Sequence, residues 1–567
     1  MMRTKNLIRV GVVSIAALSL ASCSSKLRPY SADLVKVEPK PLELVGGKVP
    51  VTVNATFPSK WFKKKAELTV TPVLQYQGGE VSGPSFQYQG EKVLGNARTI
   101  SFADGGVTKM DFSFDYKPAM QQSELYLELK GRSGNKTYSL PKVKVANGVI
   151  STEGLASAKD ASAAIAPDAF QRIIKEAHNA NILFLIQQAE IRSKELGKTE
   201  IKDWNKIVKN ANDAKNQNVS VEVQAYASPD GGLELNEKLS ERREKNTTST
   251  LKNQFAKNKI KGVDVTANYT AQDWEGFKEL VEKSNIQDKD LVLRVLQMYP
   301  DPETREKEIK NISVVFKQLA EEILPQLRRS RLTANVEIIG KSDEEIQKLS
   351  KNNPKALNVE ELLYSATLTN DQGEQERIYK EAIKLFPKDY RAYNNLGMLS
   401  YANQEYQAAN QWFNRANDVK PGNPETSMNL GLIALEEGNK DKAMQLFGAA
   451  GEVPELKEAR ALLLLNQGKY QEAVELFGDT KSNNAAVAQI LNRDYNKAIA
   501  TLNAIARPNA TTSYLKAIIG ARTNDATQVI NNLRTAVQLD RSMAKKAAKD
   551  LEFAKYMADE AFKLIVR

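Results

Sequence analysis

The sequence of 567 residues contains a single cysteine, Cys23, and a single histidine, His178. One cysteine cannot close an intramolecular disulfide, so no disulfide framework holds the fold together. Metal sites rich in His or Cys are excluded, and a Ser-His-Asp or Cys-His triad would have to use His178. We expect residues 170–178 to form a helix in which His178 is a packed or surface residue. The sequence therefore predicts no metal site.

Nucleotide-binding motifs are missing as well. The sequence has neither a phosphate-binding P-loop nor a glycine-rich dinucleotide fingerprint. Acidic residues are plentiful, so a carboxylate pair of the glycosidase type stays open, but no carboxylate stands in a suggestive context. We predict that the protein is not an enzyme and carries no cofactor.

Long apolar runs are scarce. Residues 10–20 form one, behind Arg3, Lys5 and Arg9, and it is too short for a stable membrane span. A basic start followed by a short apolar run is typical of a signal peptide, which we place at residues 1–22. No later run is long enough to span a bilayer.

The run ends in Leu20-Ala-Ser-Cys23, which resembles the lipobox of bacterial lipoproteins. The resemblance implies that Cys23 becomes the first residue of the mature chain and carries fatty acids such as palmitate. Two or more acyl chains make anchoring stable. Ser24 and Ser25 follow, where lipoproteins retained at the inner membrane often carry Asp. We therefore expect a lipid anchor in the outer membrane, facing the periplasm.

The charge balance is moderately basic. The signal peptide carries three basic and no acidic residues, which leaves 77 basic against 69 acidic residues and a charge of about +8. This surplus is a weak indication of anionic partners such as lipid headgroups or cell-wall polymers. Nucleic acid is not expected as a partner, because an exported protein rarely meets it.

The length predicts several domains. Residues 30–150 contain segments that alternate apolar and polar side chains at period two, separated by glycine-rich turns at residues 78–79 and 104–106. Short strands at this spacing predict a β-sandwich. Lys63-Lys-Lys65 is interpreted as a solvated loop rather than a headgroup contact. Residues 151–166 are rich in Ala and Ser and are interpreted as a linker.

A strand at residues 219–226, a turn at 227–232 and a helix from Leu235 precede the pattern Asn236-x-x-Leu-Ser-x-Arg-Arg243. This arrangement resembles the OmpA-like peptidoglycan-binding domain. The resemblance covers residues 167–341 and places further strands at 182–186, 263–269 and 331–339, with an insertion at about 272–327. It implies an α/β domain with a helical insertion.

The resemblance also implies candidate peptidoglycan-binding residues. Arg243 matches the family arginine that pairs with the carboxylate of diaminopimelate, and Asn236 matches the family asparagine. Ser228 stands where the family has an Asp that takes the ammonium group, so that charge is lost. Asp230 is the possible substitute, provided that the turn is remodelled. Retention and loss of peptidoglycan binding both stay open.

The last domain, residues 342–567, shows an internal repeat. Pro387 and Pro421 are 34 residues apart, and Leu396-Gly397, Ala409, Phe413 and Ala416 recur 34 residues later as Leu430-Gly431, Ala443, Phe447 and Ala450. The pattern resembles the tetratricopeptide repeat (TPR). It implies an all-α solenoid of five or six helical hairpins from residue 357, with a groove that binds peptides or protein partners.

Two functions follow. The first is an outer-membrane lipoprotein that links the membrane to the cell wall through its OmpA-like domain and recruits protein partners through its repeats. The alternative is a scaffold or accessory subunit of an outer-membrane assembly or secretion complex, whose OmpA-like domain no longer binds peptidoglycan.

Overall fold

The computed structural model describes residues 26–567, so the predicted signal peptide and Cys23 lie outside the described residues. The described chain forms two compact units. The first joins the residues up to Pro167 with Ala382–Arg567, and the second is Asp168–Glu381. The first unit is thus built from two stretches that are far apart in sequence. Among the described helices, none is both long and apolar enough to cross a membrane.

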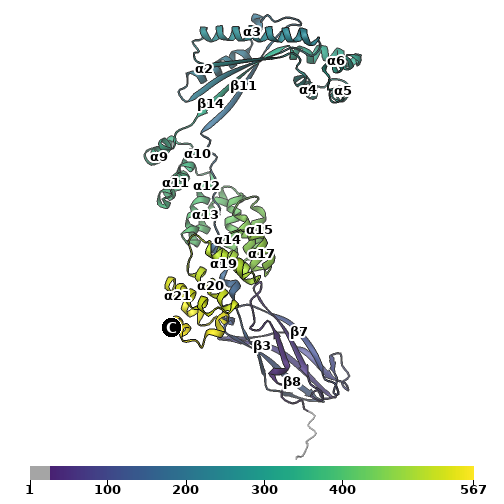
Figure 1. The fold of residues 1–567 in the computed structure, drawn as a ribbon, viewed down its shortest axis with the longest axis vertical. Coiled ribbons are helices and arrows are strands. Elements are labelled where there is room, and N and C mark those ends of the chain that lie inside the picture. Colours follow the sequence, from purple (N-terminus) through teal and green to yellow (C-terminus); the bar gives the residue numbers. More distant parts are fainter. Residues whose placement is uncertain (1–25) are drawn as a thin grey trace, which may run out of the picture. The chain divides into compact units, whose positions relative to one another are not determined.

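Residues 26–150 form two sheets around one core, here called the two-sheet domain (Figure 1). The smaller sheet has the order β1-β2-β7, and the larger has β10-β8-β3-β5-β6, with β4 beside β3 and β9 beside β8. The strands are β1 (Val35–Glu38), β2 (Lys48–Phe57), β3 (Ala66–Tyr76), β4 (Gly79–Ser82), β5 (Phe86–Gly90), β6 (Arg98–Ile100), β7 (Gly106–Asp115), β8 (Ser123–Ser133), β9 (Lys136–Ser139) and β10 (Val143–Gly148).

Alternation explains the core of the two-sheet domain. Every second residue of β2, from Val49 to Phe57, is buried, and β8 shows the same period on the facing sheet. Successive side chains of a strand point to opposite faces, so one face of each sheet supplies the core. Gly78 and Gly105 take left-handed φ values of 90° and 77° at the predicted turns, a conformation that glycine adopts without strain.

The second unit contains a four-stranded mixed sheet of order β11-β14-β12-β13, in which only β12 and β13 are parallel. Its core includes Trp204, Val223 and Leu332. The elements are β11 (Ile173–Leu183), α1 (Ser193–Leu196), α2 (Thr199–Asp213), β12 (Gln217–Tyr226), α3 (Leu233–Lys257), β13 (Asp264–Thr270) and β14 (Arg329–Ile339). We call residues 173–339 the α/β domain.

Between β13 and β14 lies the helical insertion, which has a small apolar core of its own around Phe277, Val281 and Val292. Its helices are α4 (Trp274–Lys283), α5 (Lys289–Met298), α6 (Pro302–Asn311), α7 (Ser313–Gln318), a π-helical turn (Leu319–Ile323) and α8 (Leu324–Leu327). After β14 the second unit continues with α9 (Asp343–Asn352), α10 (Val359–Thr367) and most of α11 (Gln372–Leu385).

The helix predicted at residues 170–178 is wrong. His178 lies in β11, an edge strand paired along its length with β14. The first five residues of β11, Ile173–Ala177, are all exposed, so this part of the strand lacks the alternation that would have marked it in the sequence. His178 Nε2 lies 3.0 Å from Glu176 Oε2 at the surface.

The first unit ends in pairs of antiparallel helices, here called the repeat array. The helices are α12 (Tyr390–Ala402), α13 (Tyr406–Val419), α14 (Pro424–Glu436), α15 (Lys440–Ala449), α16 (Leu456–Asn466), α17 (Tyr470–Phe477), α18 (Asn483–Leu491), α19 (Tyr495–Asn503), α20 (Ala510–Thr523) and α21 (Ala526–Leu539), followed by α22 (Ser542–Ala547) and α23 (Glu560–Val566).

Small residues let the helices of a pair approach closely. A Cβ on Gly397 would lie 2.5 Å from the ring of Phe413, and one on Gly431 would lie 2.4 Å from the ring of Phe447. Both rings are almost completely buried. The 34-residue spacing of these glycines and rings is therefore the spacing of one packing contact repeated along the array.

The repeat array also contacts one end of the two-sheet domain. Glu153, which is 5% exposed, accepts hydrogen bonds from the backbone N–H groups of Gly46 (2.7 Å) and Gly47 (3.1 Å) and from the Tyr470 hydroxyl (2.6 Å). A Cβ on Gly46 would lie 2.8 Å from the Gln467 carbonyl oxygen, so only glycine fits there. The array and the two-sheet domain thus belong to one unit.

Candidate functional site

Arg243, the residue predicted to bind a ligand carboxylate, is fully buried in α3. Its guanidinium donates three hydrogen bonds to backbone carbonyls: Nη1 to Tyr226 (2.8 Å), Nε to Gln188 (3.0 Å) and Nη2 to Leu185 (3.2 Å). The Arg243 guanidinium also lies over the Phe184 ring at 5.0 Å. The fork that was expected to hold a carboxylate therefore holds the end of β12 and the loop after β11.

Burial lowers the pKa of Arg243 to about 10, and the nearby cation Arg328 lowers it further, while Asp230 opposes both. A buried cation needs hydrogen-bond partners to offset its lost hydration. Three carbonyl oxygens supply them here. Arg243 is thus a structural residue in this conformation.

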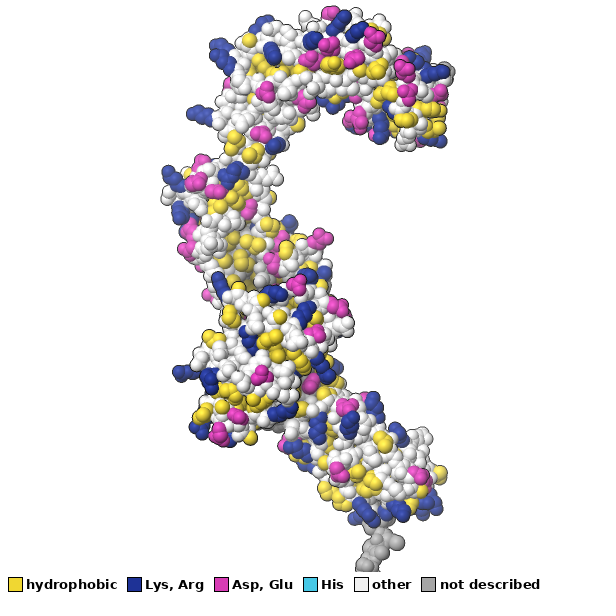
Figure 2. All heavy atoms as spheres, viewed as in Figure 1, with side chains coloured by type: hydrophobic (Ala, Val, Ile, Leu, Met, Phe, Trp, Pro, Cys, Tyr) yellow, Lys and Arg dark blue, Asp and Glu magenta, His cyan; other side chains and the backbone are white. Residues whose placement is uncertain are grey.

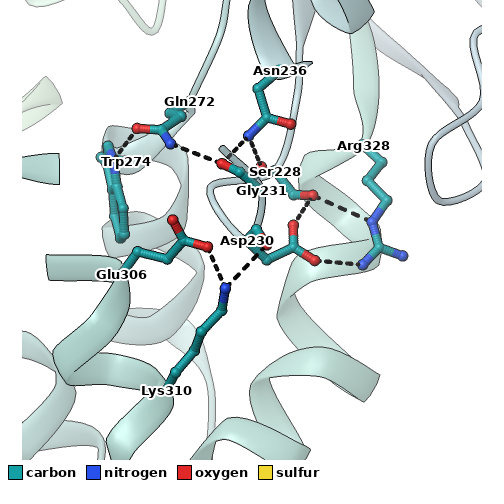
Figure 3. Close-up of polar contacts among 9 residues, drawn as sticks. All are labelled: Ser228, Asp230, Gly231, Asn236, Gln272, Trp274, Glu306, Lys310 and Arg328. Atoms are coloured by element: carbon teal, nitrogen blue, oxygen red, sulfur yellow. Dashed lines mark hydrogen bonds and ion pairs between the residues drawn. The ribbon is translucent and has the colours of Figure 1, made fainter. Parts of the chain in front are cut away.

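The other predicted residues form a closed turn between β12 and α3 (Figure 3). Asn236 donates from Nδ2 to the carbonyls of Ser228 (3.0 Å) and Gly231 (2.8 Å). The Ser228 hydroxyl donates to the Asp230 carboxylate, which also receives Arg328 Nη2 at 3.3 Å. Asp230 is therefore neutralised by Arg328 and not held ready for the ammonium group of a ligand.

Residues of the helical insertion reach the same turn. Gln272 donates to the Gly231 carbonyl at 3.1 Å, and Lys310 Nζ lies 3.4 Å from the Asp230 carbonyl oxygen (Figure 3). Lys310 is also paired with Glu306 of α6. Arg328 and Lys310 were not singled out from the sequence, because nothing in the motif indicates which distant cation meets Asp230.

The turn and α3 can thus hold each other in place but offer little charge to a ligand. Of the four candidate residues, Ser228, Asn236 and Asp230 come together in the turn. Arg243 lies on the same helix as Asn236 but points its fork at other carbonyls. Among the described residues, no group of three or more His, Cys, Asp and Glu side chains is arranged to hold a metal ion.

The second candidate site is the face of the repeat array that the first helices of the pairs form, and the chain itself fills it. The prediction that residues 151–166 are a free linker is wrong. Three buried asparagines, each 0–2% exposed, hold this connecting segment by its backbone. Asn395 of α12 accepts from Ala166 N–H (2.8 Å) and donates to its carbonyl (3.0 Å).

Asn429 of α14 does the same for Ala164, at 2.7 and 2.8 Å, and Asn394 adds a further hydrogen bond to the Ala164 carbonyl at 3.0 Å. Asn484 of α18 pairs with both backbone groups of Ser157, each at 2.9 Å. A side-chain amide carries one acceptor and a donor pair, so it matches the N–H and C=O of one residue. This is recognition of an extended backbone, independent of side-chain identity.

The composition of the connecting segment fits this role. Ala158, Ala164 and Ala166 are at most 2% exposed, and larger side chains would not fit at these positions without displacing their neighbours. The tyrosine Tyr401 adds a hydrogen bond from its hydroxyl to the Ala158 carbonyl. The Ala-rich composition that resembles a linker is thus a consequence of close packing.

The asparagines were missed from the sequence, although a signal for two of them is present. Asn395 and Asn429 are 34 residues apart, the same period as the framework residues. A polar residue that recurs at the repeat period, on the helix that lines the groove, indicates a repeated contact with an extended chain.

Comparison with known proteins supports the repeat assignment. A family model described as tetratricopeptide repeat matches residues 376–424. A search of curated proteins gives no match.

Solved structures with similarity to this chain include a tetratricopeptide repeat protein from Parabacteroides merdae, at 17% identity and a TM-score of 0.28, covering 40% of this chain and 91% of that one. The PilF protein of Pseudomonas aeruginosa is 16% identical with a TM-score of 0.28, covering 39% and 100%. PilW, a type IV pilus biogenesis factor, is 13% identical with a TM-score of 0.25, covering 40% and 98%. The helical pairs of the C-terminal region are therefore tetratricopeptide repeats.

Proposed function

We propose that this protein is a lipid-anchored scaffold of the outer membrane, held at the bilayer by acyl chains on Cys23 and facing the periplasm. The observation that carries the proposal is the tetratricopeptide array, because such helical pairs present extended surfaces that contact protein chains. The array already contacts two parts of its own chain, the connecting segment and the two-sheet domain. A scaffold of this kind organises protein rather than converting a substrate, and we propose that it is not an enzyme.

The filled groove limits how a partner can bind. A protein that enters the face lined by α12, α14 and α18 has to displace residues 152–166 from Asn395, Asn429 and Asn484. The second helices of the pairs, such as α13 and α15, carry no contact of this kind with the connecting segment among the described residues. We therefore assign the first contact with a partner subunit to the second-helix side.

The second candidate function is a tether to peptidoglycan through the α/β domain, which we propose is OmpA-like. It is favoured by the match of Asn236 and Arg243 to the family motif and by the succession of strand, turn and helix around them. It is disfavoured by the three carbonyls that occupy Arg243 and by the Arg328 that neutralises Asp230. The scaffold is the better supported of the two.

Two experiments separate these functions. In cells, a photo-crosslinking residue placed at an exposed position of α13 or α15 should capture a membrane-associated protein, and its absence would contradict the scaffold. In the second experiment, purified protein is mixed with peptidoglycan sacculi and centrifuged. The scaffold predicts that the protein stays in the supernatant.

Arg243→Ala is a poor control for the sacculus experiment because it removes a buried structural group. Asp230→Asn and Arg328→Ala change groups that lie nearer the surface, with side chains 19% and 12% exposed. If wild-type protein pellets with sacculi and either variant does not, the tether replaces the scaffold as the conclusion. Membrane fractionation of Cys23→Ser tests the anchor separately, and we expect this variant to lose its outer-membrane location.

A further inference from the structure

One end of the two-sheet domain carries an excess of basic side chains, which we call the basic face. It is formed by the loops at residues 58–65, 91–97 and 101–105, the hairpin turn at 133–136, and the first described residues, 26–30. These segments contain two acidic residues, Glu91 and Asp104. Figure 2 shows Lys and Arg side chains gathered at this end of the domain. The basic residues are Lys26, Arg28, Lys60, Lys63, Lys64, Lys65, Lys92 and Lys136.

Contacts between the loops hold these charges on one surface. Lys92 N–H donates to the Lys64 carbonyl at 2.8 Å, and Lys60 N–H donates to the Phe102 carbonyl at 2.7 Å. The ammonium groups of Lys63 and Lys64 lie over the Phe102 ring, at 5.7 and 5.4 Å from its centre. The loops are therefore one surface and not separate mobile tips.

The start of the described chain belongs to the same surface. Trp61 Nε1 donates to the Pro29 carbonyl at 3.4 Å, and Leu27 N–H donates to the Tyr138 hydroxyl at 2.8 Å. Three residues separate Lys26 from Cys23, and an extended chain of that length spans at most about 10 Å. If Cys23 is acylated, as the proposed function holds, the basic face is the end of the domain next to the bilayer.

An exposed leucine stands among these lysines. Leu94, in the loop that follows Lys92, is fully exposed at 103% of its reference area. Val107, at the start of β7, is 58% exposed. Apolar side chains surrounded by Lys and Arg are typical of surfaces that lie in the interfacial layer of a membrane. The repeat array occupies the opposite end of the domain, where Gly46 and Leu44 meet Lys440 and Tyr470.

We propose that the basic face docks on anionic lipid headgroups, with Leu94 entering the interfacial layer of the bilayer. Each Lys or Arg near an anionic surface adds a similar increment of attraction, and the effect is screened by salt. The acyl chains would then hold the protein at the membrane, while the basic face fixes which way the two-sheet domain stands on it. This inference rests on the proposed anchor for its geometry, but it concerns a different contact.

The test uses the full lipoprotein with a fluorophore at Leu94→Cys, reconstituted into vesicles that carry a quencher on the lipid headgroup. Cys23 is the only natural cysteine, so acylation leaves the introduced thiol as the single labelling site. The control is the same label at Gln77→Cys, an exposed turn at the other end of the domain. We expect strong quenching at residue 94, and little at residue 77, in vesicles that contain phosphatidylglycerol.

A charge variant sharpens the test. Replacing Lys63, Lys64 and Lys65 by Gln should lower the ratio of docked to undocked protein on the order of 100-fold, and high salt should act in the same direction. Replacing three exposed lysines outside the basic face (Lys48, Lys109 and Lys117) removes the same charge and should leave quenching unchanged. Equal quenching at residues 94 and 77, or quenching that ignores the first triple variant, would overturn the proposal. Failure of the anchor is recognised separately, because unacylated protein would not float with vesicles of phosphatidylcholine alone.

Discussion

The two sites that the sequence singles out for binding, the Arg243 motif and the repeat groove, are both filled by the chain's own backbone, but in different ways. Arg243 holds carbonyls at residues 185, 188 and 226, within one domain. The asparagines of the array hold residues that are 229 to 327 positions away in sequence. The first contact is part of a single domain's fold, whereas the second joins distant parts of the chain and can be released without unfolding the helices. The comparison teaches that a match to a binding motif does not decide whether its ligand is external.

The largest effect is expected for Arg243→Ala. Three buried carbonyls would lose a charged donor, and we expect a loss of about 4 kcal/mol in the stability of the α/β domain. Hydrogen–deuterium exchange of β12 and α3 measures it. The matched control is Arg242→Ala, because Arg242 is the exposed neighbour on the same helix. If the two variants exchange alike, Arg243 is not a structural residue and becomes available again as a ligand-binding residue.

The next effect concerns the connecting segment. Asn429→Ala would leave the N–H and C=O of Ala164 short of partners in a buried place, at a cost of about 3 kcal/mol. We expect residues 152–166 to become sensitive to limited proteolysis while the helices of the array stay protected. Asn414→Ala, at an exposed position of α13, should change nothing. Unfolding of the whole array in the Asn429 variant would show that the segment and the repeats are as inseparable as Arg243 and its domain.

A smaller loss is expected where the helices of a pair meet. Gly431→Ala places a methyl group against the Phe447 ring and should destabilise the array by about 2 kcal/mol, as overpacking does. Gly448→Ala, in the helix α15 that carries Phe447, meets nothing within 4 Å and should stabilise the helix slightly. Chemical denaturation of the two variants compares them directly. Opposite signs are expected, and the same sign would contradict the packing described for the repeats.

The smallest effect concerns the contact between the repeats and the two-sheet domain. Burial raises the pKa of Glu43, and Glu552 adds to this, while Arg522 and Arg493 oppose it. Because the pKa in the folded state exceeds that in the unfolded state, the folded state binds the proton more tightly, and stability falls as the pH rises through this range. Glu43→Gln should therefore raise the melting temperature at pH 7 by an amount worth about 1 kcal/mol or less, and the gain should vanish near pH 4. Glu38→Gln, in β1, serves as the exposed control.

Much of the fold could be predicted because it depends on local periodicity. The alternation in β2, β3, β7 and β8 and the 34-residue spacing of Gly397 and Gly431 both reflect packing between neighbours in sequence. The place of the connecting segment could not be predicted in this way. Backbone recognition by Asn395 and Asn429 leaves no trace in the residues that are recognised, apart from their small size. The use of Arg243 was missed for a related reason, since three carbonyls leave no signature in the sequence.

The path of the connecting segment also sets the order in which the molecule can be completed during synthesis. Residues 152–166 leave the ribosome early, whereas Asn395, Asn429 and Asn484 follow more than 200 residues later, after the whole second unit. The hydrogen bonds between them are among the most nonlocal in the chain, and contacts of this kind form slowly. The apolar alanines of the segment therefore stay exposed until the last repeats exist. A chain released before Asn484 has been made cannot complete its first unit, so the fold itself distinguishes finished from unfinished protein.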